Sequence, residues 1–160
     1  MRDNSFSKKI AHIQRRKIAA NKVVQLEAYR QADAVLHHKE EKAVLIVDDD
    51  DVVRQAFKRV LAKEKYRVYM AKDGLELSSV LAETKLDLIF LDTALPWVSG
   101  IEICSLIKSH PTLKKVPVVL LSTAKDAENI QNSFSAGADE YLTKPLRMEQ
   151  LLKVVSTWLG

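Results

Sequence analysis

Short, fully apolar runs separated by helical patterns are the feature that most constrains this chain. Residues 43–47 form a run rich in β-branched side chains, and similar runs occupy residues 86–91 and 116–121. Between the runs, apolar residues recur with helical spacing, as at Val53 and Phe57. Because a strand that is apolar throughout is buried on both faces, the pattern predicts a parallel sheet covered by helices.

The same alternation extends to the end of the sequence. Residues 66–71 predict a further strand, and Tyr141 with Leu142 marks a short last one. Gly137 is well placed to end the fourth helix of the series, and Pro145 precedes the final helical stripe. We therefore predict five βα units in a doubly wound α/β fold.

The first 42 residues differ from the rest in charge. They hold ten Lys or Arg against five Asp or Glu, a net of +5, whereas residues 43–160 hold fifteen against sixteen. This shift predicts a domain over residues 43–160 preceded by a basic extension over residues 1–42. Residues 5–41 lack Pro and Gly and predict a helix, but their apolar positions keep no clean heptad, so a dimeric coiled coil stays open.

The amino-acid composition constrains the cellular compartment in which we expect the protein. No run approaches the roughly 20 apolar residues of a membrane span, and the first residues contain no apolar core of a secretory signal. Cys104 is the single cysteine, which excludes an intramolecular disulfide, and it falls in an apolar-periodic stretch. We expect a cytoplasmic protein with Cys104 in its core.

Reactive side chains stand where the predicted strands end. Residues 48–51 are four aspartates after the first strand, Asp92 follows the third, Ser122 and Thr123 follow the fourth, and Lys144 follows the fifth. Open parallel sheets bind ligands at this edge. Several converging carboxylates need a positive charge among them, which Mg²⁺ and Lys144 would supply.

Acidic residues after a strand also suit the N-terminus of the next helix, where carboxylates cap free N–H groups. Asp50 and Asp51 directly precede the first helical stripe, so for them capping and metal binding stay open. For Asp48 and Asp49 we favour the metal site, because Asp92 and Lys144 occupy other strand ends.

These motifs identify a family. The chain resembles the response-regulator receiver domain of bacterial two-component signalling in stretches spread over nearly all of residues 43–160. The matching stretches are VLIVDDDDVVR, AKDGLEL, DLIFLDTALPWVSG, VPVVLLSTAKD and GADEYLTKPL. The resemblance implies a flavodoxin-like sheet of five parallel strands in the order 2-1-3-4-5.

The resemblance also implies a metal and phosphoryl site. Asp48 and Asp49 match the acidic pair that holds Mg²⁺, and Asp92 matches the aspartate that is phosphorylated and ligates the metal. The backbone carbonyl of Ala94 matches a further metal ligand. Lys144 matches the lysine that contacts the phosphoryl oxygens.

Two further positions match the family's switch. Thr123 is similar to the switch hydroxyl, and Tyr141 to the aromatic residue that moves inward on activation. The bond between Lys144 and Pro145 is a candidate cis peptide.

The implied protein is not a conventional enzyme, because it catalyses only its own Mg²⁺-dependent phosphorylation and dephosphorylation. Its expected partners are a histidine kinase or phosphotransfer protein and a downstream protein target. We expect a stand-alone, chemotaxis-type receiver, with homodimerisation through the N-terminal helix or the fourth and fifth helices left open. The alternative is a nucleic-acid-binding regulator acting through basic residues 1–42, although their net charge is modest.

Overall fold

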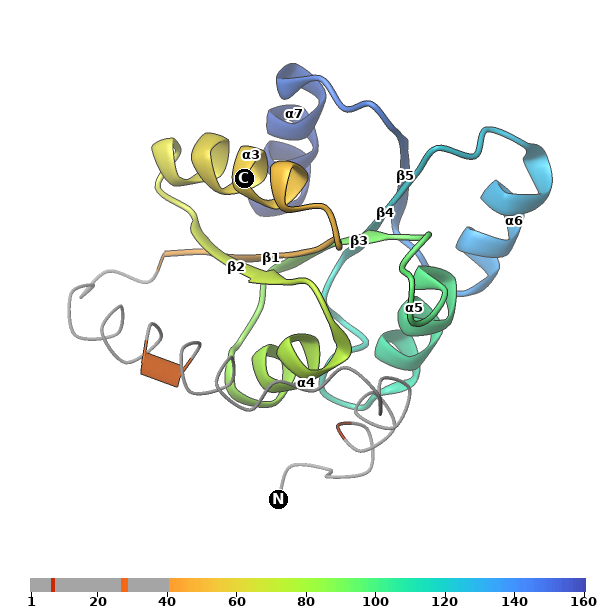
Figure 1. Cartoon of the computed structure of the whole chain (residues 1–160), viewed down its shortest axis with the longest axis horizontal. Helices are drawn as coiled ribbons and strands as arrows, with labels where there is room; N and C mark the ends of the chain where they lie inside the picture. Colours follow the sequence, from red (N-terminus) through yellow and green to blue (C-terminus); the bar gives the residue numbers. More distant parts are fainter. Residues whose placement is uncertain (1–6, 8–26, 29–40) are drawn as a thin grey trace.

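The computed structural model describes residue 7, residues 27–28 and residues 41–160, and the last range forms an α/β sandwich (Figure 1). Its central sheet is parallel, with the order β2-β1-β3-β4-β5. The strands are β1 (Ala43–Val47), β2 (Arg67–Ala71), β3 (Leu88–Asp92), β4 (Val118–Ser122) and β5 (Glu140–Thr143). The predicted doubly wound fold is confirmed. The helix predicted over residues 5–41 lies almost entirely outside the described residues.

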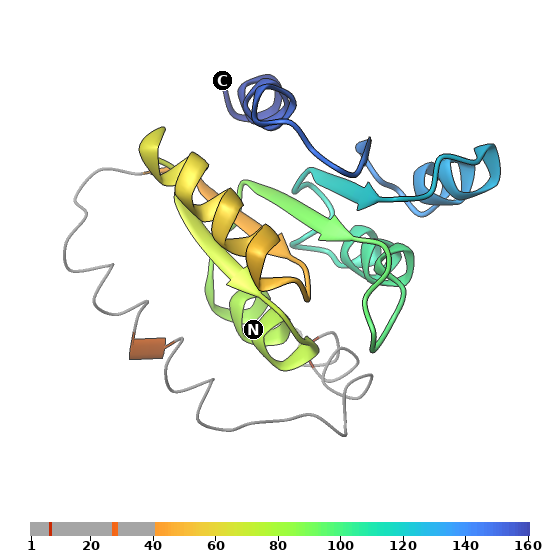
Figure 2. The same cartoon turned by 45° about the horizontal axis from the view of Figure 1, so that its top comes forward.

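Helices cover both faces of this sheet (Figures 1 and 2). One face carries α3 (Asp51–Lys63) and α7 (Met148–Leu159), and the other carries α4 (Gly74–Glu83) and α5 (Gly100–Ser109). The remaining helix, α6 (Ala127–Ser135), packs near β5 and α5 at the sheet edge. Within the described part of the chain, no helix is long and apolar enough to cross a membrane.

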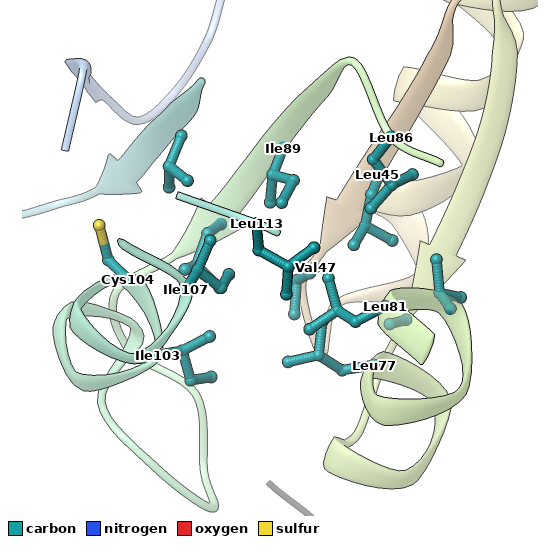
Figure 3. Packing of buried hydrophobic residues seen from close by; sticks show 14 of the residues in the cluster. Leu45, Val47, Leu77, Leu81, Leu86, Ile89, Ile103, Cys104, Ile107 and Leu113 are labelled. Atoms are coloured by element: carbon teal, nitrogen blue, oxygen red, sulfur yellow. The ribbon is translucent and has the colours of Figure 1, made fainter. Parts of the chain in front are cut away.

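Each strand contributes side chains to two hydrophobic cores, because successive side chains point to opposite faces of the sheet. In β1, Leu45 and Val47 join the core under α4 and α5, whereas Val44 and Ile46 join the core under α3 and α7. Figure 3 shows the first of these cores, with leucines of α4 and isoleucines of α5 on either side of Val47. This two-sided burial explains why the strand sequences are apolar throughout.

Side-chain caps start the helices that follow the first four strands. Asp50, Asp73, Ser99 and Asp126 each accept a backbone N–H from the first turn of α3, α4, α5 and α6, respectively. These caps lie at the carboxyl ends of the strands, so the chain turns into each helix directly at that edge. The residue after the C-cap of α6 is Gly137, with a φ of 98°, as its predicted capping role requires.

Two strands end one residue later than the apolar runs predict. Asp92 is the last residue of β3, paired with Leu121, and Ser122 is the last residue of β4, paired with Thr143. The ladder continues past the apolar residues because a backbone N–H and C=O pair regardless of the side chain. Both polar side chains are therefore held by the rigid sheet rather than by a loop.

Cys104 is a core residue, as predicted. It is fully buried on α5, and burial raises the pKa of its thiol to about 11. At about pH 8 the thiol is therefore almost entirely protonated, and the protonated form is unreactive. We expect a disulfide reagent such as DTNB to label the native protein far more slowly than the urea-unfolded protein. Equal labelling rates in the two states would contradict this burial.

Candidate functional site

Three carboxylates meet at the carboxyl edge of the sheet. Asp48 and Asp49 follow β1, Asp92 ends β3, and one oxygen from each lies within 4.8 Å of the others. Asp48 and Asp92 are buried, whereas Asp49 is exposed. This all-oxygen cluster, open to solvent on one side, has the donor set that a hard divalent cation such as Mg²⁺ prefers. The structure thus brings together the three acidic residues that the sequence predicted.

Asp48 is anchored through its backbone and both carboxylate oxygens. Its Oδ1 accepts the backbone N–H of Asp50 at 2.9 Å, and its Oδ2 accepts Lys144 Nζ at 2.7 Å. Its own N–H donates to the carbonyl of Ala71 in β2 at 3.2 Å. A fully buried carboxylate requires such partners, because an unpaired buried charge is costly. The side chain is consequently held in one orientation.

Lys144 links the two buried acids. Its Nζ lies 2.7 Å from Asp48 Oδ2 and 3.3 Å from Asp92 Oδ2. Burial opposes the charge of Lys144, but the hydrogen bond and charge of Asp48, together with Asp92, outweigh burial and raise the pKa of Lys144 above its ordinary value. The site therefore keeps a permanent cation at neutral pH. The Lys144–Pro145 bond is cis, as expected from the sequence.

The segment after β3 folds back on the end of this strand. The backbone N–H of Ala94 donates to Asp92 Oδ1 at 3.0 Å, and Ala94 forms a β-bridge with Ser99. Gly100, the first residue of α5, donates its N–H to the carbonyl of Thr93 at 2.9 Å. These bonds orient Asp92 and bring the start of α5 against its backbone.

The structure separates the roles of the four consecutive aspartates. Asp50 is the N-cap of α3 and accepts the N–H of Val52 at 2.9 Å. Asp51 is exposed and forms an ion pair with Arg54 at 2.9 Å. Neither belongs to the cluster that could hold a metal. The question left open by the sequence is thus answered in favour of helix capping and ion pairing for these two residues.

The two neighbouring hydroxyls at the end of β4 differ in environment. Thr123, the predicted switch residue, is exposed, whereas Ser122 is 5% exposed. Ser122 Oγ accepts the N–H of Ala124 at 3.1 Å. Tyr141 is half-buried, and its hydroxyl donates to the carbonyl of Ala124 at 2.5 Å. Of these two hydroxyls, that of Ser122 is therefore the buried one, and the expected switch residue Thr123 is its exposed neighbour.

Arg54 is a further residue near the site, and it is not among the residues predicted from the sequence. This residue lies on α3 but is only 8% exposed, and its Nη1 donates to the backbone carbonyl of Asp48 at 2.7 Å. A signal existed, because Arg54 shares the buried face of α3 with Phe57 and Leu61 at helical spacing. A charged residue on an apolar stripe, directly after an acidic run, indicates a partner within the fold.

The geometry agrees with comparisons to known proteins. A sequence model of the response regulator receiver domain matches residues 44–156. Response regulator MprA of Mycobacterium sp. (strain KMS) is 35% identical over 100 residues, which cover 62% of this chain and 43% of that protein. Protein PilG of Pseudomonas aeruginosa is 32% identical over 103 residues, covering 64% of this chain and 76% of PilG. The chain thus spans less than half the length of the MprA relatives.

Solved structures of response regulators are also similar to this chain. The chemotaxis response regulator CheY4 of Vibrio cholerae superimposes with a TM-score of 0.70 at 30% identity, covering 74% of this chain and 99% of CheY4. A putative response regulator from Chloroflexus aurantiacus J-10-fl gives a TM-score of 0.70 at 32% identity, covering 75% of this chain and 98% of that one. Fold, site and sequence agree, and the chain belongs to the response regulator receiver domain family.

Proposed function

We propose that this protein is a two-component response regulator that accepts a phosphoryl group on Asp92 and signals through phosphorylation-dependent protein–protein contact. The observation that carries the proposal is the cluster of Asp48, Asp49 and Asp92 within 4.8 Å, with Lys144 bound to two of them. In this arrangement one buried carboxylate faces both a cation site and a fixed ammonium. That is the environment a phosphoryl acceptor needs.

The residues present fit a Mg²⁺ ion. The carboxylates of Asp48, Asp49 and Asp92 and the backbone carbonyl of Ala94 would hold it. When bound, Mg²⁺ would neutralise charge on the transferring phosphoryl group. Asp49 is the exposed member of the cluster, so a cation from solvent would reach the site on its side.

The acceptor chemistry follows from the fixed groups. A carboxylate oxygen of Asp92 forms a bond to phosphorus while the N–P bond of a donor phosphohistidine breaks, and the leaving imidazole takes up a proton from water. Lys144 stabilises the negative charge on the phosphoryl oxygens, and Ala94 N–H orients the carboxylate. Small acyl phosphates would serve as donors in the same way. The protein thus acts only on itself, during both phosphorylation and dephosphorylation.

Ser122 is a better switch hydroxyl than Thr123 in this proposal. Its side chain is buried at the end of the strand next to β3, whereas Thr123 is exposed. A phosphoryl group on Asp92 would draw this hydroxyl toward it. The Ser122 movement would be transmitted to Tyr141 through Ala124, which bonds to both residues. The surface around α6 and β5 would then change for a partner.

A paired substitution tests this assignment. With beryllofluoride and Mg²⁺ as a phosphoryl mimic, we expect Ser122→Ala to reduce the chemical-shift change of the Tyr141 amide, because the responding hydroxyl is gone. Thr123→Ala, one residue away, should respond like the wild-type chain in ¹H–¹⁵N spectra. A reduced chemical-shift change in Thr123→Ala, with a wild-type response in Ser122→Ala, would assign the switch to Thr123.

The metal site can be tested without any phosphoryl donor. Wild-type protein should bind Mg²⁺ in a calorimetric titration, and Asp49→Asn should weaken the binding because it removes an anionic ligand. Asp50→Asn is the matched control, since asparagine also caps helices and Asp50 lies outside the cluster. Equal loss in both variants would point to general charge effects and oppose the proposed ligands.

The proposed partners are a histidine kinase or phosphotransfer protein upstream and a protein target downstream. A cytoplasmic location fits such partners. Homodimerisation stays a prediction. The nucleic-acid alternative depends on residues 1–42, and neither the described residues nor the comparisons support it.

A further inference from the structure

Arg54 ties together the loop that carries the acidic pair. Its Nη1 donates to the carbonyl of Asp48 at 2.7 Å, and its Nη2 donates to Asp51 Oδ1 at 2.9 Å. Its backbone N–H also donates to the carbonyl of Asp50 at 3.1 Å. One residue of α3 therefore contacts three of the four consecutive aspartates.

The bond to Asp48 acts on a peptide group next to the site. The Asp48 carbonyl belongs to the peptide group that joins Asp48 to Asp49, so the bond fixes the backbone from which both carboxylates project. Charge-assisted hydrogen bonds from arginine are short and strong, and this one is buried. It therefore restricts the direction in which Asp48 and the following Asp49 present their oxygens.

The bond to Asp51 has a different consequence. The Asp51 side chain is 73% exposed, so this ion pair adds little to stability. It does draw the Asp51 carboxylate toward Arg54 on the first turn of α3. Arg54 thus holds the backbone of Asp48 and pairs with Asp51, an acid outside the cluster.

We propose that Arg54 is a positioning residue for the metal centre, and that its guanidinium selects Asp48 and Asp49 from the run of four aspartates as the pair facing the cation. This inference rests on the proposed function, because it concerns the same metal site. It concerns the shape of the guanidinium rather than its charge. A lysine in the same place would keep the charge but lacks the planar fork that places Nη1 on the carbonyl of Asp48.

The test is calorimetric titration of the full chain with Mg²⁺. Residues that orient metal ligands typically change metal affinity by tenfold or more, so Arg54→Lys should bind Mg²⁺ about tenfold more weakly than wild type. Arg59→Lys is the matched control, because Arg59 is exposed on the same helix, and it should bind like wild type. Asp51→Asn should also remain close to wild type, since the exposed pair is not the bond that orients Asp48.

A second variant separates orientation from charge. Arg54→Met removes a positive charge near the acidic cluster, so a purely electrostatic role predicts tighter Mg²⁺ binding, whereas the positioning role predicts weaker binding. Urea unfolding without Mg²⁺ monitors the fold of each variant. Unchanged affinity in Arg54→Lys, tighter binding in Arg54→Met, or failure of both variants to fold would overturn the proposal. If the wild-type chain itself binds no Mg²⁺, the proposed function is contradicted. If only the Arg54 variants deviate from the expected affinities, the positioning role of Arg54 is contradicted and the proposed function is not.

Discussion

The Asp92→Asn variant is expected to take up no phosphoryl group from acetyl phosphate in the presence of Mg²⁺, whereas the wild-type chain should be labelled. The amide of asparagine is not a nucleophile toward phosphorus, and the substitution also removes one anionic ligand of the proposed metal site. Both changes act on the transfer itself, so the loss should be complete rather than partial. Intact-protein mass spectrometry at successive times of incubation measures the phosphoryl uptake.

The variant should remain folded. An amide oxygen at this position can still accept the N–H of Ala94, and Lys144 retains its 2.7 Å contact with Asp48. Asp50→Asn, the same substitution at the helix cap, should be labelled at the wild-type rate. Full labelling of Asp92→Asn would show that the acceptor is another residue.

Replacing Gly100 with alanine should destabilise the domain severely. An alanine Cβ at this position would lie 2.0 Å from the carbonyl oxygen of Asp92 and 2.8 Å from its carbonyl carbon. Both are backbone atoms of a central strand, which cannot move aside as a flexible side chain would. We expect a loss of about 3 kcal/mol or more in the free energy of unfolding, the upper range for overpacking a core.

Urea unfolding measures this loss, and Gly160→Ala is the control. A Cβ at Gly160 meets no atom within 4 Å, so that variant should unfold like wild type. Any folded fraction of Gly100→Ala should also bind Mg²⁺ more weakly, because the contact displaces the backbone of Asp92. Wild-type stability in Gly100→Ala would mean that α5 does not approach β3 this closely.

The fold could be predicted because its determinants are redundant along the sequence. Every residue of β1, β3 and β4 is buried, including Asp92 and Ser122 at the strand ends. Hydrophobic runs of this kind specify strands wherever both faces are covered. The strand ends were less predictable, because backbone pairing extends past the last apolar residue at Leu91 and Leu121.

The sequence predicts which residue types form the site and at which strand ends they lie. It does not predict which of several adjacent, similar residues takes each role. Ser122 and Thr123 are adjacent hydroxyls, and only the pairing of Ser122 with Thr143 fixes which one is buried. Asp50 and Asp51 are chemically identical to Asp48 and Asp49, and the start of α3 separates their roles. Arg54 lies on the apolar face of α3, which indicates a partner within the fold, but only the structure identifies that partner as the carbonyl of Asp48. Such distinctions depend on tertiary contacts that residue type and spacing do not encode.

Phosphoryl transfer to Asp92 is expected to require a metal ion. The most direct measurement is to incubate the wild-type chain with acetyl phosphate, with and without Mg²⁺, reduce the product with borohydride, and locate the resulting homoserine by peptide mass spectrometry. We predict homoserine at position 92 alone, and only when Mg²⁺ is present. Homoserine at another aspartate, or labelling of Asp92 that is unchanged when Mg²⁺ is chelated, would contradict the account.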